Sequence, residues 1–258
     1  MLILNTVRGL RALSAIGVLL TVTALVASLG AGSAAAATGR YYYAGVMKAT
    51  TATTQYGVGG RILIANPAIA YGADMVTSEM SIVHGANVAL VETGYRKFGT
   101  AYPTLMIGYW KDGVFRDSAG FVTVHPTYRP GMSLAGYVGL PVQFYIRYDR
   151  GNWWVWFNNA WVGYFPGSLW AGTFTSGEYT HWYGEVYSTS GGLPLTDMGN
   201  GRFGSDPQAA YIDNMCQHGA DITCWWMTGA SRSETDASLY SLSYAGGTSL
   251  RHGGNGGG

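Results

Sequence analysis

Short runs in which apolar and polar side chains alternate recur along most of the chain. A period of two places alternate side chains on opposite faces of a strand, and no long stretch shows the helical period of 3.6. Turn-forming residues separate the runs, as at Asn66-Pro67 and Ser190-Gly191-Gly192. The pattern predicts strands at 60–65, 88–95, 104–109, 121–125, 142–148, 153–157, 161–165, 182–187 and 239–244.

The clearest hairpin joins the runs 153–157 and 161–165 through Asn158-Asn159-Ala160. Asparagine tolerates the positive φ that tight hairpin turns require. Many short strands at close spacing predict an all-β protein. We expect a curved sandwich of two antiparallel sheets, of the jelly-roll or lectin-like kind.

The first 37 residues resemble a secretory signal peptide. Arg8 and Arg11 form a basic start, an uncharged run covers 12–29, and small residues fill 31–37. The run approaches the length of a membrane anchor, but the alanine-rich exit without stop-transfer charges favours cleavage near Ala37. We therefore predict a secreted protein with a signal peptide at 1–37, one β-sandwich domain at 38–252 and a flexible glycine-rich tail at 253–258.

Composition excludes several classes of protein. Hydrophobic residues make up 48% of the 258 residues and charged residues 11%, which is the reverse of a disordered chain. The formal net charge of +1 offers no basic surface for nucleic acid. We expect a monomer that binds neither nucleic acid nor, after signal cleavage, a membrane.

The chain has two cysteines, Cys216 and Cys224. In an exported protein they are expected to form a disulfide that closes a small loop. A zinc site is the alternative, because His218 lies nearby, but no second histidine stands at ligand spacing. The sequence predicts no metal and no organic cofactor.

Two generic motifs lack the context that their chemistry needs. The segment 199–204 matches the dinucleotide pattern G-x-G-x-x-G, but it follows no clear strand and opens no helix, so we predict a loop. The segment 131–135 nearly matches a nucleophile elbow, which requires an α/β sheet.

Glutamates are more informative, because the chain has only five and two lie within predicted strands. Glu92 shares a strand face with Leu90, and Glu185 shares one with Tyr183 and Tyr187. Apolar neighbours desolvate a carboxyl and raise its pKa, and a second carboxyl nearby raises it further. The alternative is that each glutamate pairs with an arginine or faces water.

Four segments resemble the neprosin domain in order and spacing. They are Glu92-Thr93-Gly94-Tyr95 with 104–110, the hairpin 151–165, Trp182-Tyr183-Gly184-Glu185-Val186, and 197–203. The resemblance covers about residues 61–215. It implies a β-sandwich glutamic endopeptidase that cuts after proline, with Glu92 and Glu185 as the catalytic pair.

A pair of carboxyls that shares one proton can activate water as a base and protonate the substrate as an acid. This mechanism predicts activity at acidic pH on a polypeptide, which the resemblance makes a proline-containing one. Proline packs on aromatic rings, and Tyr183, Tyr187 and Trp110 are candidates for such contacts.

Two other functions remain open. Two carboxylates and stacking aromatic rings also suit a lectin-like glycoside hydrolase. The fold would equally serve a secreted binding module without catalytic activity, although the presence of both Glu92 and Glu185 argues against it.

Overall fold

The computed structural model describes residues 39–49, 55–85, 88–219, 223–227 and 229–258, and the predicted signal peptide lies outside these ranges. Every strand ladder is antiparallel, and the only helices of the described residues are two short 3₁₀ turns, η1 (Ala135–Tyr137) and η2 (Gly167–Trp170). The predicted all-β class is therefore confirmed. None of the described residues forms a helix with the length and apolar character that crossing a membrane requires.

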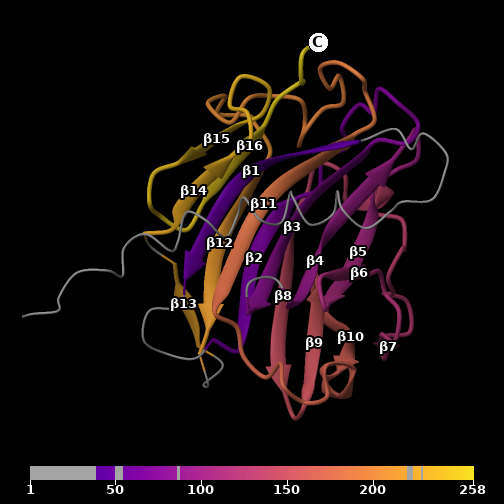
Figure 1. Ribbon diagram of the computed structural model, residues 1–258, viewed down its shortest axis with the longest axis vertical. Coiled ribbons are helices and arrows are strands. Elements are labelled where there is room, and N and C mark those ends of the chain that lie inside the picture. The colour runs from indigo at the N-terminus through magenta and orange to yellow at the C-terminus, as the bar shows by residue number, and fades with distance from the viewer. Residues whose placement is uncertain (1–38, 50–54, 86–87, 220–222, 228) are drawn as a thin grey trace, which may run out of the picture. The chain divides into compact units, whose positions relative to one another are not determined.

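The strands form two sheets, which Figure 1 shows one in front of the other. The seven-stranded sheet has the order β14 (Ser231–Glu234), β1 (Arg40–Ala49), β11 (Tyr179–Ser188), β3 (Met75–His84), β4 (Ala89–Phe98), β5 (Thr104–Lys111), β6 (Val114–Arg116). The nine-stranded sheet has the order β15 (Ser241–Tyr244), β16 (Leu250–Gly253), β12 (Tyr211–His218), β2 (Gly57–Leu63), β8 (Pro141–Asp149), β9 (Asn152–Phe157), β10 (Ala160–Pro166), β7 (Val122–Thr123), with β13 (Cys224–Trp226) paired to β12.

The inner faces of the two sheets share one hydrophobic core. Trp182 of β11 reaches across it, and its indole donates a hydrogen bond of 3.0 Å to the carbonyl oxygen of Gly59 on β2. Trp153 of β9 is also fully buried and donates to the carbonyl of Phe174 at 2.9 Å. Burying such a side chain contributes about 1.5–3 kcal/mol. The predicted sandwich of two packed sheets is confirmed.

The predicted hairpin is confirmed as β9 and β10. Asn158 begins the turn between them with a φ of +59°. On β9, Trp153 and Val155 face the core, whereas Trp154 and Trp156 are half-buried on the opposite face. The alternation in the sequence therefore gives the correct faces.

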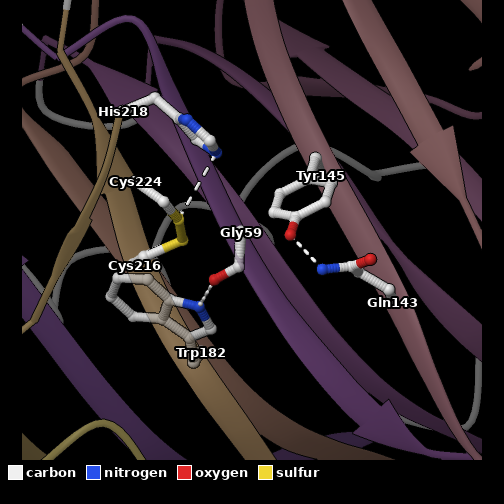
Figure 2. The surroundings of a disulfide bond; sticks show 7 residues. All are labelled: Gly59, Gln143, Tyr145, Trp182, Cys216, His218 and Cys224. Carbon is white, nitrogen blue, oxygen red and sulfur yellow. Dashed lines mark hydrogen bonds between the residues drawn. A yellow bond between two sulfur atoms is a disulfide. The ribbon is translucent and has the colours of Figure 1, made fainter. Parts of the chain in front are cut away.

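The disulfide Cys216–Cys224 is also confirmed and links β12 to β13 across a Cα–Cα distance of 5.5 Å (Figure 2). His218 Nε2 lies 3.8 Å from the sulfur of Cys224. On the neighbouring strands the ring of Tyr145 lies against Gly59, where any side chain would collide with it. The disulfide therefore fixes the short strand β13 to β12 in the nine-stranded sheet.

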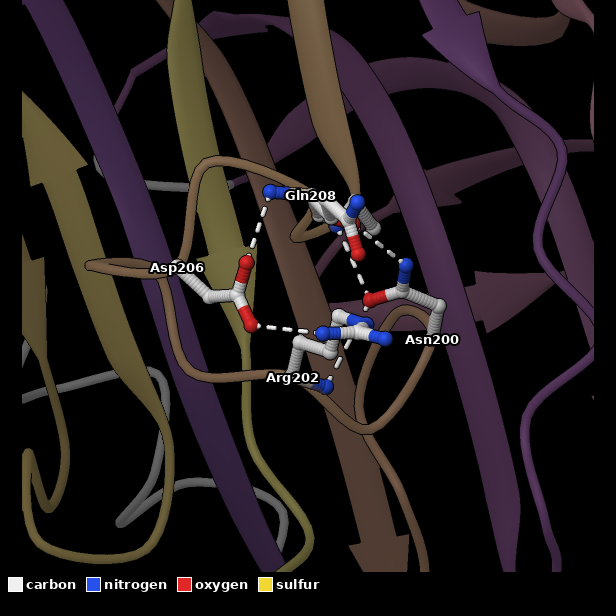
Figure 3. A network of polar contacts seen from close by, with 5 residues as sticks. Asn200, Arg202, Asp206 and Gln208 are labelled. Atoms are coloured by element: carbon white, nitrogen blue, oxygen red, sulfur yellow. Dashed lines mark hydrogen bonds and ion pairs between the residues drawn. The ribbon is translucent and has the colours of Figure 1, made fainter.

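The glycine-rich segment 199–204 is a loop, as predicted (Figure 3). Arg202 forms an ion pair of 2.8 Å with Asp206, and the side chain of Asn200 donates to the carbonyl of Gln208 at 2.8 Å. These contacts cross-link the loop to itself, which is a structural role.

The prediction of a flexible tail at 253–258 is wrong. Gly253 ends β16, and Gly254 accepts a hydrogen bond of 2.9 Å from the backbone of Met198. Both glycines are buried, with φ values of +147° and +153° that other residues rarely adopt. A side chain at Gly254 would collide with the carbonyl of Leu239. The glycines thus serve close backbone packing rather than flexibility.

A glycine substitution tests how tightly β3 and β4 pack. An alanine Cβ at Gly94 would collide with the carbonyl of Ser78 and stand 2.6 Å from the Cα of Glu79. We expect Gly94→Ala to lower the free energy of unfolding by about 1–3 kcal/mol or more, measured by urea denaturation.

Gly72→Ala is the matched control, because Gly72 is exposed and has no heavy atom within 4 Å of the added Cβ. Its effect should stay within about 0.5 kcal/mol. Equal effects of the two substitutions would contradict the packing seen between β3 and β4.

Candidate active site

Three glutamates lie on the face of the seven-stranded sheet that is turned away from the core. They are Glu79 on β3, Glu92 on β4 and Glu185 on β11, three neighbouring strands of the sheet. Met80 and Ile82 of β3 point into the core, so alternation directs Glu79 to the opposite face. The sheet therefore gathers three of the five glutamates of the chain in one place.

The strand register places Glu79 between the other two. Glu92 stands opposite Ser81, and Glu185 stands opposite Thr77. Ser81 and Thr77 are each two residues from Glu79 on β3. Each of the other glutamates is therefore one strand across and two residues along from Glu79, in opposite directions.

The structure places Glu92 and Glu185, the predicted catalytic pair, on one sheet face, two strands apart and with Glu79 between them. The two residues are 93 positions apart in the chain, yet the charge of Glu185 acts on Glu92. Glu79 is an additional member that the sequence analysis missed. Val76, Met80 and Ile82 are apolar residues at alternate positions around Glu79, but Ser78 interrupts this series, so the sequence analysis predicts no strand there.

All three carboxyls are shielded from water although they lie outside the core. Glu79, Glu92 and Glu185 are only 3%, 6% and 8% exposed. Aromatic side chains stand on the same face, among them Tyr43 on β1 and Tyr183 on β11. Removing a carboxylate from water disfavours its charged form.

Burial is the main cause of the raised pKa values in this group. It raises the pKa of Glu79 to about 7 and the pKa values of Glu92 and Glu185 well above their usual range. The charge of Glu79 raises the pKa of both neighbours further. The three groups titrate together, so their protons belong to the cluster.

Hydrogen bonds favour the charged forms but do not overcome burial. The hydroxyl of Thr77 donates to Oε1 of Glu79 at 3.0 Å. Hydrogen bonds from Tyr43 to Glu185 and from Trp110 to Glu92 lower the pKa of each acceptor.

The structure does not support the alternative in which each glutamate forms an ion pair with an arginine. Arg96 lowers the pKa values of Glu79 and Glu92 through its charge, but its guanidinium forms an ion pair of 2.9 Å with Asp117. Within the described ranges, none of the three glutamates forms a salt bridge.

The three aromatic residues predicted to contact substrate lie on the same sheet face. Tyr183 stands directly opposite Glu79, with its ring 6.0 Å from that of Tyr43. Tyr187 packs on Tyr41 at 4.8 Å. Trp110 packs on Phe115 of β6 at 5.6 Å and also bonds to Glu92. Their contact with substrate stays a prediction.

Polar atoms without partners cluster beside the glutamates. Oγ of Ser81 and Nε2 of His181 are buried and make no hydrogen bond. Ser81 stands opposite both His181 and Glu92 in the ladder. Burial lowers the pKa of His181 to about 4, so this side chain is neutral above that pH. Unsatisfied buried atoms cost about 1–3 kcal/mol each, and a bound substrate or water would satisfy them.

The described residues contain one group with the side chains of a metal site, Cys216, His218 and Cys224, whose ligand atoms lie within 4.8 Å of one another. Both sulfurs are in the disulfide and are not thiolates. The geometry supports the disulfide rather than the zinc alternative.

Comparison with known proteins agrees with this architecture. The profile of the Neprosin family matches residues 72–255, which include all three glutamates. Scytalido-glutamic peptidase with a peptide-based transition-state analog is similar in structure, with a TM-score of 0.52 and 12% identity over 84% of this chain and 100% of that one.

The same peptidase with a transition-state analog inhibitor gives a TM-score of 0.51 at 12% identity, again over 84% of this chain and 100% of that one. SCP-B, an eqolisin-family peptidase in complex with the tripeptide Ala-Ile-His, gives 0.49 at 10% identity over the same shares. At 12% identity the likeness to scytalido-glutamic peptidase shows the fold.

The raised carboxyl pKa values predict how pH changes stability. A carboxyl whose pKa is raised on folding stabilises the protein below its unfolded value, and the contribution is lost as pH rises through the folded value. We expect Glu185→Gln to gain stability relative to the wild type between pH 4.5 and pH 7, by about 1–3 kcal/mol, measured by urea denaturation across that range.

The comparison of variant with wild type removes the contributions of the histidines, which both proteins share. Glu178→Gln is the control, because Glu178 is exposed and lies outside the cluster. A difference between Glu185→Gln and wild type that stays constant with pH would contradict the raised pKa.

Proposed function

Because the chain belongs to the Neprosin family and is a glutamic-type peptidase, we propose that Glu92 and Glu185 catalyse its hydrolysis of internal peptide bonds. The observation that supports this most strongly is the sharing of one sheet face by two buried, electrostatically coupled carboxyls. A pair that holds one proton supplies both an acid and a base.

In the proposed reaction the ionised glutamate removes a proton from water as the water oxygen attacks the scissile carbonyl carbon. The protonated glutamate donates its proton to the carbonyl oxygen as negative charge develops there. The tetrahedral intermediate then collapses. One of its hydroxyls returns a proton to the glutamate that acted as the acid, and the peptide nitrogen leaves with a proton from the glutamate that took it from water. No proton is lost or gained by the pair over these steps.

The same protonation requirement leads us to propose activity at acidic pH. The pair works only while it holds one proton, and activity is lost when that proton dissociates. Because the pKa values of Glu92 and Glu185 are raised, the proton is retained above the ordinary range of a glutamate. The pH optimum is therefore expected to be weakly rather than strongly acidic.

We propose a proline-containing polypeptide as the substrate. The resemblance to prolyl-cleaving peptidases suggests it, and the exposed part of the Trp110 ring beside Glu92 offers a surface on which a proline ring would pack. Secretion through a signal peptide at 1–37 and a monomeric state complete the proposal, and both stay predictions.

The central experiment replaces each glutamate of the pair with glutamine. Glu92→Gln and Glu185→Gln should each lower kcat/KM by at least about 100-fold, because neither amide can exchange a proton. The assay incubates the purified protein with a proline-containing peptide from pH 3 to pH 7 and identifies the products by mass spectrometry.

Glu178→Gln serves as the control and should retain wild-type activity. Parallel incubation with polysaccharides tests the glycoside hydrolase alternative. Glycan cleavage with an intact peptide, or full activity in either dyad variant, would overturn the proposed function.

The role of Trp110 in specificity is tested separately. Trp110→Ala should lower the preference for proline over alanine before the scissile bond by about 10-fold, since an apolar contact is lost. The ratio of kcat/KM for two peptides that differ at that residue measures the preference. Trp161→Ala, on the outer face of the other sheet, is the control, and an unchanged ratio in Trp110→Ala would contradict the assignment.

A further inference from the structure

Glu92 and Glu185 are too far apart along the sheet to be simple neighbours. They lie two strands and four residues apart, since Thr77 and Ser81 are their partners on β3. With ordinary strand spacings, their Cα atoms would be about 16 Å apart in a flat sheet. Glu79 stands about 8 Å from each by the same reckoning.

Electrostatics independently identify Glu79 as the nearest charged partner of both. Among the charges that act on Glu92, Glu79 has the largest effect, ahead of Glu185. Glu79 is likewise the charge that acts on Glu185. The two outer glutamates thus sense Glu79 more strongly than they sense each other.

The outer glutamates are also held away from each other. Oε1 of Glu92 lies 3.4 Å from the position of a Cβ on Gly108, so this carboxyl leans over β5 towards Trp110. Glu185 is hydrogen-bonded to Tyr43 on β1, the other side of β11. A gap would remain at the centre of the site if Glu79 were absent.

The carboxyl of Glu79 is positioned to fill this gap. The hydroxyl of Thr77 donates to Oε1 of Glu79 at 3.0 Å, and a hydrogen bond from Tyr183 also lowers the pKa of this carboxyl. Gly94 stands directly opposite, and a Cβ there would come within 2.8 Å of the Cβ of Glu79. The hydroxyl of Ser81, two residues along on the same face of β3, is buried and has no hydrogen-bond partner.

The titratable and charged groups that share this face with Glu79 come from three strands. They are Tyr43 on β1, His181, Tyr183 and Glu185 on β11, and Glu92 and Arg96 on β4. His181 is neutral through the acidic range above pH 4, and Tyr43 and Tyr183 keep their protons because burial raises the pKa of both. The carboxyls are therefore the groups that exchange protons at weakly acidic pH.

We infer that Glu79 is a third member of the site, a positioning residue that exchanges the shared proton with Glu92 and with Glu185. It lets two carboxyls on non-adjacent strands work as one acid–base pair. This inference rests on the proposed function of Glu92 and Glu185, and it adds a route by which the shared proton moves between them.

This exchange conserves protons. A turnover begins only when the shared proton is on the glutamate that acts as the acid. When the proton is on the base instead, protonated Glu79 accepts it on one oxygen and donates its own proton from the other oxygen to the acid. One O–H bond breaks and one forms at each transfer, and no proton is exchanged with bulk water.

Glu79→Gln tests the inference while keeping the shape of the side chain and the acceptor for Thr77. Removing the charge of Glu79 lowers the pKa values of Glu92 and Glu185, so the pair loses its proton at lower pH. On the alkaline side of the profile, the pH at which kcat/KM falls to half its maximum should decrease by about one unit, and kcat should be lower. This side of the profile is its alkaline limb. Glu178→Gln should leave the limb in place.

A second readout does not require peptidase activity. With only five glutamates, the full chain labelled with ¹³C at the glutamate carboxyl gives five signals to follow by NMR as pH changes. In the wild type, Glu79, Glu92 and Glu185 should show shared inflections. Glu178 and Glu234 serve as internal references.

Each outcome decides one question. Shared inflections that move in Glu79→Gln support the inference even if no peptide is cleaved, in which case only the proposed function fails. Two results would overturn the inference and leave the proposed function intact, provided that the peptide is cleaved. One is a Glu79 signal in the wild type that titrates independently of Glu92 and Glu185. The other is a kcat/KM profile of Glu79→Gln whose alkaline limb stays where it is in the wild type.

Discussion

The exclusion of water from three like-charged groups on one sheet face is the constraint on which this site depends. Each of the glutamates on β3, β4 and β11 would prefer to ionise in water, and their mutual repulsion adds to the cost of ionising them together. The fold resolves this by keeping protons on the cluster at pH values where isolated carboxyls have lost them. Carboxyls that keep a proton in this pH range can act either as an acid or as a base.

Packing in the rest of the sandwich offsets the free-energy cost of the buried carboxyls. The inner faces of the same three strands bury Met80, Val91 and Trp182 in the core, and the tryptophan is bonded across to β2. Apolar burial on one face thus stabilises the strands whose other face carries the unfavourable carboxyls. Gly94 and Gly108 remove the side chains that would otherwise stand opposite Glu79 and Glu92. The site is consequently held by regular strands rather than loops, which favours fixed geometry.

Sequence reasoning predicted the parts of this arrangement that are local. The pattern of apolar and aromatic side chains located the strand of Glu92, the strand of Glu185 and the hairpin at Asn158. It missed β1, β3 and β12, where a glycine or a small polar side chain interrupts the apolar positions. Glu79 was missed with β3. Which strands are neighbours depends on long-range pairing that no local pattern encodes. The tail at 253–258 packs through contacts with the segment near Met198, and the glycines of the tail alone do not indicate those contacts.

The buried histidines bear on the pH range over which such a site persists. Burial lowers the pKa values of His181 and His252 to about 4, so their contribution to stability is present above pH 6.5 and declines as pH falls. His252 lies in the core, where its ring contacts the hydroxyl of Ser78 at 3.0 Å and the carbonyl oxygen of Ala210 at 3.3 Å, and burial disfavours its charged form. The contribution of Glu79 has the opposite sign, because its raised pKa stabilises the fold most below pH 4.5 and the effect is lost through about pH 7. Glu92 and Glu185 also have raised pKa values and add to the trend of Glu79. Between pH 4.5 and pH 6.5 the carboxyls and the two histidines therefore change stability in opposite directions, in the weakly acidic range in which a carboxyl pair with raised pKa values holds one proton.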